Sequence, residues 1–140
     1  MIDFSLDDRL AADSLPLCET PDSLLRVIRD ARFPWLILVP RHPGLADLID
    51  LAPEDEPAVM AVIRTASEAL KAATGCDKLN VASLGNQVRQ LHVHIIARFE
   101  TDAAWPGPIW GVGKANPMDA LPDWAVTVQR ALVAKGWAAS

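Results

Sequence analysis

Two histidines separated by one residue carry the strongest chemical signal in this sequence. His92 and His94 lie in the segment QLHVHII, residues 90–96, where polar and apolar residues alternate. Because successive side chains of a β-strand point to opposite faces, Gln90, His92 and His94 are expected to share one face. The apolar residues between them can pack on a helix behind the strand. Two imidazoles and an amide in one patch are poorly explained by packing and indicate a functional site.

An aligned pair of imidazoles supports two kinds of chemistry. The pair can chelate zinc or iron. Alternatively, one neutral imidazole can attack phosphorus and form a labile phospho-histidine, while the other orients it or handles a proton. The third histidine, His42, lies in a proline-rich turn, where we expect a solvated side chain by default.

Strand and helix patterns flank the histidine segment. Trp35–Val39 is β-branched and aromatic and is closed by Pro40, which is typical of a buried strand. Apolar residues at helical spacing from Pro53 to Ala73, with acidic residues in the first turn and Gly75 after the end, predict an amphipathic helix. We further expect strands at Lys78–Ala82 and Val88–Phe99 and a last helix at Pro122–Lys135.

These elements predict an α+β fold with an antiparallel sheet, one long helix and a C-terminal helix. The segment at residues 23–30 fits either a further strand or a short helix. The chain has 140 residues, with no internal repeat and no linker of the kind that separates domains. We therefore expect a single domain over residues 1–140.

The overall composition narrows the function further. A formal net charge of −5 argues against nucleic acid polymers and membrane surfaces as partners, because both require clustered positive charge. Residues 1–9 carry three aspartates and no apolar run, so we do not expect a signal peptide. Cys18 and Cys76 lie far apart and fit reduced, buried thiols. Together these features predict a cytoplasmic protein.

The QLHVHII segment resembles the signature of the histidine-triad (HIT) nucleotide-binding family, which is His-φ-His-φ-His-φ-φ with φ apolar. The order of elements from residue 24 to 111 is also similar to that family. The resemblance implies a HIT-like α+β subunit that forms a homodimer and needs no cofactor or obligatory metal. It also implies a HIT-type phosphohydrolase or phosphoramidase, which acts at the α-phosphate of a small nucleotide through a nucleotidyl-histidine intermediate.

The family's site roles fall on particular residues of this chain. The resemblance implies that His92 is the nucleophile and that His94 sits beside the phosphate and assists. Gln90 stands where the family has its first histidine, and it can hydrogen-bond but cannot titrate. The family's Gly-Gln-Ser/Thr-Val run, which holds phosphate, corresponds here to Gly85, Asn86, Gln87 and valine, with Gln87 in place of the hydroxyl residue.

Three further positions are candidates for the nucleotide site, and each also fits a purely structural role. Asn80 and Asn86 are candidates for the family's nucleotide-contacting asparagine, or they are turn or strand-end residues. Asp30 lies where the family places a ribose-binding aspartate, and it equally suits a turn. The loop over residues 105–111 fits a wall of the pocket, a dimer contact or a loop with buried tryptophans.

Two other functions fit parts of the pattern. A non-catalytic nucleotide sensor on the same fold is suggested by Gln90. A cupin-like metal-binding protein is suggested by the spacing of glycines, histidines and an acid, namely Gly85, His92, His94, Glu100 and Gly107. Two of those intervals are one residue longer than the cupin pattern, and the helix at Pro53–Ala73 is out of place in an all-β barrel.

Overall fold

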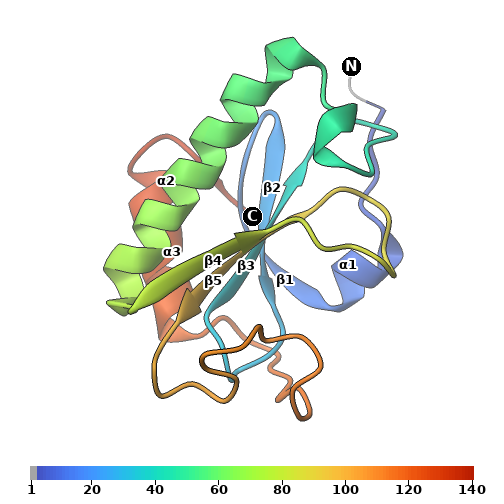
Figure 1. Ribbon diagram of the computed structural model, residues 1–140. Coiled ribbons are helices and arrows are strands. Elements are labelled where there is room, and N and C mark those ends of the chain that lie inside the picture. The colour runs from blue at the N-terminus through green and yellow to red at the C-terminus, as the bar shows by residue number, and fades with distance from the viewer. Residues whose placement is uncertain (1–2) are drawn as a thin grey trace.

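An antiparallel sheet forms the frame of the molecule (Figure 1). The computed structural model describes residues 3–140. Met1 and Ile2 lie outside the described residues; they belong to the stretch 1–9, for which no signal peptide was expected. Within that range the six strands lie in the order β4-β5-β3-β2-β1-β6. The strands are β1 (Ser14–Thr20), β2 (Ser23–Ile28), β3 (Trp35–Pro40), β4 (Lys78–Ala82), β5 (Val93–Arg98) and β6 (Ala138–Ala139). The helices are α1 (Asp8–Ala12), α2 (Glu56–Thr74) and α3 (Asp123–Val133), with short 3-10 turns at Leu48–Asp50 and Pro53–Asp55.

The two faces of the sheet differ in what covers them. Helices α2 and α3 pack on one face and bury its apolar side chains in the main core (Figure 1). In β3 and β5 that face carries Leu36, Leu38, Val93 and Ile95, all of which are buried. Ile37 of β3 pairs with His94 of β5, so these two side chains point to the opposite face. The alternation predicted for the histidine segment therefore places His94 away from the helices.

The predicted long helix is confirmed as α2. Its first predicted residues, Pro53–Asp55, form a separate 3-10 turn, and the α-helix begins at Glu56. Gly75 ends it in the left-handed conformation (φ 64°) and donates its backbone N–H to the Lys71 carbonyl at 2.8 Å. A residue with a side chain would be strained at that position, which explains the glycine.

The predicted strands are confirmed except at the start of β5. The segment at residues 23–30 contributes a strand, β2, and not a helix. The prediction of a strand from Val88 is wrong, because β5 begins only at Val93. The pairing with both neighbouring strands ends at that point: the ladder with β4 ends at Ala82 opposite His94, and the ladder with β3 ends at Leu38 opposite Val93. Residues 88–92 consequently form a loop outside the sheet, which contacts other segments of the chain.

Several properties predicted from composition can be compared with the structure. Cys18 and Cys76 are free and buried, as expected, and burial together with the nearby Glu19 raises the pKa of Cys18 to about 12. No helix among the described residues is long and apolar enough to cross a bilayer.

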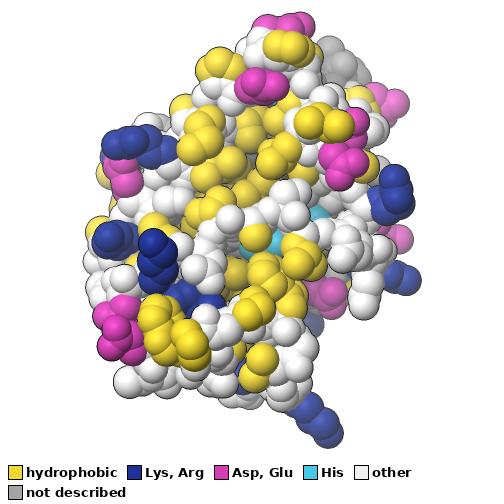
Figure 2. All heavy atoms as spheres, viewed as in Figure 1, with side chains coloured by type: hydrophobic (Ala, Val, Ile, Leu, Met, Phe, Trp, Pro, Cys, Tyr) yellow, Lys and Arg dark blue, Asp and Glu magenta, His cyan; other side chains and the backbone are white. Residues whose placement is uncertain are grey.

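Large apolar side chains are exposed on α2 and β4, where Met60 is 62% and Val81 is 49% exposed. Figure 2 shows hydrophobic side chains gathered on the face that carries these two elements.

A buried ion pair organises the loop that follows β5. The guanidinium of Arg98 donates to the carboxylate of Asp102 at 2.8 Å and to the Gly107 carbonyl at 2.8 Å. The Asp102 carboxylate also accepts the backbone N–H groups of residues 99, 104 and 105. The hydrogen bond from Arg98, opposed by burial and reinforced by these backbone donors, holds the pKa of Asp102 well below its usual range.

We expect Asp102→Ala to lower the free energy of unfolding by about 3–5 kcal/mol at neutral pH, because it leaves the buried Arg98 without a counter-charge. In the wild type this contribution is present above the pKa of an unfolded aspartate, about 3.9, and is lost as the pH falls below it. Urea denaturation at several pH values measures both effects. Glu68→Ala is the control: its partner Arg64 is 78% exposed, so the loss should stay below about 0.5 kcal/mol. Equal losses in the two variants would contradict this account.

Candidate active site

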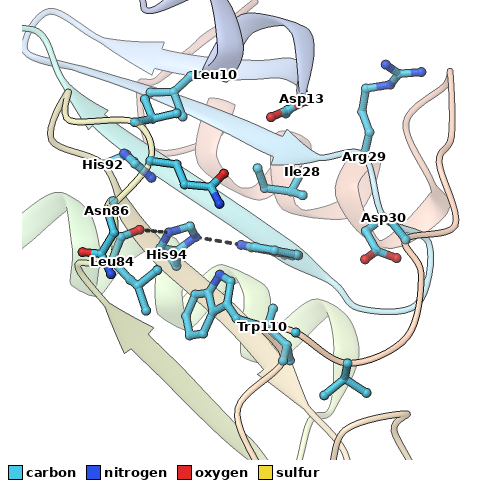
Figure 3. A pocket seen from close by; sticks show the side chains of 18 of the residues that line it. Leu10, Asp13, Ile28, Arg29, Asp30, Leu84, Asn86, His92, His94 and Trp110 are labelled. Carbon is cyan, nitrogen blue, oxygen red and sulfur yellow. Dashed lines mark hydrogen bonds between the residues drawn. The ribbon is translucent and has the colours of Figure 1, made fainter.

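A cavity of about 630 Å³ lies on the face of the sheet opposite α2 and α3. Its walls come from α1, from the end of β2, from the loop after β4 and from the loop after β5. His92 and His94 line the cavity together, and in the view of Figure 3 they lie at the end away from Asp30. Both imidazoles are largely buried, with exposed fractions of 6% and 5%.

The imidazole of His92 is oriented by the backbone of Gln90. Its Nδ1 lies 2.7 Å from the Gln90 carbonyl oxygen. A carbonyl oxygen only accepts hydrogen bonds, so Nδ1 must carry the hydrogen. In the neutral ring the lone pair then resides on Nε2, which is the nitrogen available for nucleophilic attack.

The imidazole of His94 has a partner for each ring nitrogen. The indole N–H of Trp35 donates to Nδ1 at 3.0 Å, and Nε2 lies 2.8 Å from the Leu84 carbonyl oxygen (Figure 3). His94 also packs edge-on against Trp110, with ring centroids 5.0 Å apart, and against His92 at 4.9 Å. Burial lowers the pKa of His94 to about 4, although the bond to Leu84 opposes the shift. His94 is therefore neutral at physiological pH.

The loop after β4 brings backbone groups beside His92. Gly85, Asn86 and Gln87, which correspond to the family's phosphate-holding run, line the cavity. Their binding of phosphate stays a prediction. In the part of the chain that the structure describes, no backbone N–H from Leu84 to Val88 donates to another protein group. A Cβ at Gly85 would lie 2.5 Å from the Val88 carbonyl oxygen and 2.9 Å from Cε1 of His92. Only glycine allows this close approach of loop and imidazole.

A second, smaller hollow of about 90 Å³ adjoins the same loop. It shares Gly85, Asn86 and His92 with the main cavity. Its remaining lining residues come from the stretch at 46–47 and from positions 83, 89 and 90. His92 and the glycine loop thus stand between two open spaces.

The side chain of Gln90 forms its hydrogen bonds with the segment before α1 and not with His92. Its amide oxygen accepts the backbone N–H of Asp7 at 2.8 Å, and its amide nitrogen donates to the Ser5 carbonyl at 2.9 Å. His92 is therefore held by the main chain of Gln90, and the side chain of Gln90 fastens the segment that leads into α1.

Asp30 lies at the other end of the cavity, where its carboxylate is already engaged. It accepts hydrogen bonds from the guanidinium of Arg32, at 2.8 Å to Oδ2, and from the backbone N–H of Arg32 and Asn116. Burial alone would raise the pKa of Asp30, but the bonds from Arg32 and Asn116 outweigh it and lower the pKa. A ribose contact at Asp30 stays a prediction, and it would have to share Oδ2 with Arg32.

The remaining predicted positions divide between the cavity and other parts of the fold. Asn80 does not line the cavity, because Arg98 holds its amide oxygen at 2.8 Å on β4. His42 is half-buried and is also absent from the cavity walls. From the loop at 105–111, Ile109, Trp110 and Gly111 line the cavity. The interpretation of this loop as a pocket wall therefore fits the structure.

Two site residues were not singled out from the sequence. Trp35 was predicted only as part of a buried strand, yet its indole N–H holds His94. No motif in the sequence indicates Arg32, although it neutralises Asp30 and donates to the Val112 carbonyl at 2.6 Å. The available signals were a tryptophan at the first position of a strand, where its polar edge can reach a partner, and an arginine two residues after an aspartate.

The cupin-like interpretation is wrong about the fold. The sheet is open, and α2 and α3 cover one of its faces. The third ligand that a metal site would need is also missing from the geometry: among residues 3–140, no three His, Cys, Asp or Glu side chains cluster closely enough to hold a metal ion.

Comparison with known proteins is consistent with this geometry. The model of the HIT domain matches residues 9–101. A histidine triad protein from Bradyrhizobium japonicum is 46% identical, with a TM-score of 0.87, over 91% of this chain and 96% of that one. A histidine triad protein from Sinorhizobium meliloti is 41% identical, with a TM-score of 0.85 and the same coverage. One from Marinobacter aquaeolei is 39% identical, with a TM-score of 0.80, over 92% and 93% of the two chains. No curated protein matches the chain.

Proposed function

The chain belongs to the HIT domain family, and this membership supports a nucleotide-binding or hydrolase-type function in general. From this premise we propose that the protein is a nucleotide phosphohydrolase or phosphoramidase. It acts at the α-phosphate of a nucleotide ester, anhydride or phosphoramidate. The observation that carries this proposal is the orientation of His92: the Gln90 carbonyl fixes the hydrogen on Nδ1 and leaves the lone pair on Nε2.

The reaction proceeds in two displacements at phosphorus. In the first, Nε2 of His92 forms a bond to the α-phosphorus, and the bond from phosphorus to the leaving oxygen or nitrogen breaks. The Gln90 carbonyl stabilises the positive charge that develops on the ring through the Nδ1–H bond of 2.7 Å. In the second, water attacks the phosphorus and loses a proton to solvent, the phosphorus–nitrogen bond breaks, and a nucleoside monophosphate leaves with the neutral imidazole restored. The leaving group of the first displacement departs with the bonding electron pair and takes up a proton from solvent.

The loop after β4 is suited to hold the phosphoryl oxygens. Gly85, Asn86 and Gln87 line the cavity beside His92, and none of their backbone N–H groups donates to another described protein group. Such donors bind negative charge without bringing a positive charge of their own. Asn86, whose side chain also borders the cavity, can add a donor. This arrangement explains how a chain with a net charge of −5 can take an anionic substrate.

The nucleoside half of the substrate then extends toward Asp30. The wall between the two ends of the cavity is apolar and aromatic and includes Ile28, Trp35 and Trp110. A base can pack against such side chains, and the Asp30–Arg32 pair presents both an acceptor and a donor to the ribose.

We expect His92→Ala to lower the turnover of an adenosine phosphoramidate and of dinucleoside polyphosphates about a thousandfold or more, because no other group can form the intermediate. Product release followed by chromatography measures the rate, and thermal melting checks the fold. His42→Ala is the matched control and should keep the wild-type rate, since His42 does not line the cavity. Full activity of His92→Ala would contradict the mechanism. Binding of AMP by the wild type without any turnover would favour the nucleotide sensor.

The role of the Gln90 side chain can be tested separately from that of its backbone carbonyl. Gln90→Ala removes the side-chain bonds to Asp7 and Ser5 but leaves the carbonyl that holds His92. We therefore expect a loss of stability of about 1 kcal/mol with far less loss of turnover than in His92→Ala, measured by urea denaturation and initial rates. A loss of turnover as large as that of His92→Ala would show that the side chain takes part. Gln90→His, which restores the family pattern, raises activity only if the side chain can reach the site.

We also propose that the chain forms a homodimer through β4 and α2. Among the described strands β4 lies at an edge of the sheet, paired only with β5, so one row of its backbone groups is free to pair with a second copy. Met60 on α2 and Val81 on β4 are exposed and add apolar surface. Hydrophobic side chains gather on the face that carries these two elements (Figure 2).

Sedimentation equilibrium should give a wild-type mass of twice 15.2 kDa. The double variant Met60→Asp and Val81→Asp should be monomeric, because burying two added carboxylates is costly. Val133→Asp is the control, since Val133 on α3 is also exposed (44%) and lies outside the proposed interface. A monomeric wild type, or dissociation by the control as well, would rule out this interface.

A further inference from the structure

The two hydrogen bonds of His94 are compatible with only one state of its ring. An indole nitrogen can donate but not accept, so Trp35 requires a lone pair on Nδ1. The Leu84 carbonyl oxygen can accept but not donate, so it requires a hydrogen on Nε2. Only the neutral Nε2–H tautomer satisfies both partners. Adding a proton at Nδ1 would set two N–H groups against each other.

These two partners belong to different parts of the fold. Trp35 is the first residue of β3, within the sheet. Leu84 precedes Gly85 in the loop whose backbone borders His92. His94 therefore connects the rigid sheet to the loop proposed to hold the phosphoryl oxygens. The rings of His92 and Trp110 pack edge-on against His94 from two further directions and restrict its rotation.

We infer that Trp35 is a positioning residue, whose indole N–H fixes His94 as the neutral tautomer that anchors the loop at Leu84 beside the nucleophile. Only the catalytic consequence of this inference rests on the proposed function; the positioning of His94 by Trp35 does not. In this role His94 assists the reaction through the loop and holds its own hydrogen in a bond to the protein. It neither donates a proton to the substrate nor contributes a positive charge.

The surroundings of His94 are consistent with a ring that is neutral at physiological pH. Trp35, Leu84 and Trp110 are uncharged, and His92 is the titratable group in contact with it. Burial lowers the pKa of His94 to about 4, the bond to Leu84 opposes the shift, and the neighbouring His92 adds to it. The ring therefore keeps its tautomer across the neutral pH range.

Long-range proton–nitrogen NMR of the full chain with ¹⁵N-labelled histidine tests the inference without any substrate. The wild type should show the Nε2–H tautomer of His94 at neutral pH and protonation near pH 4. Trp35→Phe removes the donor to Nδ1, so the midpoint should rise by about one pH unit, and the backbone NMR order parameters of Gly85–Val88 should fall. Trp110→Phe is the matched control: Trp110 packs on the same ring without donating to it, so tautomer and midpoint should stay unchanged.

A second replacement covers the case in which Trp35→Phe does not fold. β-(3-Benzothienyl)alanine in place of Trp35 keeps the shape of the indole and substitutes sulfur for its N–H. A raised midpoint in this protein, with none in Trp110→Phe, supports the inference. An unchanged midpoint, or an Nδ1–H tautomer in the wild type, overturns it. If the tautomer pattern holds while no nucleotide is turned over, the proposed function fails and the role of Trp35 in fixing His94 stands.

Discussion

The register between β3 and β5 is the constraint on which the rest of the site depends. Ile37 lies opposite His94 and Leu36 lies opposite Ile95. A slip of one residue would turn His94 toward the helices and bring Ile95 to the cavity. Such a slip is opposed by the core, because Leu36 and Ile95 are fully buried beneath α2 and α3. Burial on one face of the sheet thus determines the position of the imidazoles on the other.

Sequence patterns predicted the elements that are governed by periodicity. The α2 stripe follows side-chain burial, which repeats along the helix in the same way as the sequence does. The alternation in β5 follows the two faces of the sheet, one packed against the helices and one facing the cavity. The start of β5 could not be obtained from its own residues. Val88 to His92 carry a strand-like pattern, but strand pairing stops where β3 and β4 end. The strand β1 was not predicted, because it contains Pro16 and its ladder with β2 is interrupted between Pro16 and Cys18.

The same distinction applies to the site. His92, His94 and the Gly85–Gln87 loop could be located from residue types and a family resemblance, because their identities are chemically unusual. Their partners could not. The bond from Trp35 to His94 joins positions 59 apart and requires the register of the sheet. The bond from Arg98 to Asn80 also depends on pairing between β4 and β5, and it removes from the cavity an asparagine that the sequence made a candidate.

Gln90 shows how one position of the histidine motif can change while the contact that orients His92 is kept. A residue at this position has two separable tasks in principle, one toward His92 and one toward the rest of the fold. Here the task toward His92 belongs to the carbonyl oxygen of Gln90, 2.7 Å from Nδ1 of His92, and every amino acid supplies a carbonyl oxygen. The side chain is left free for the scaffold, where an uncharged amide can both accept from Asp7 and donate to Ser5 at any pH. A histidine would make the same pair of bonds only in its neutral form. The glutamine therefore removes a titrating group from the neighbourhood of His92 and keeps the backbone contact that orients it.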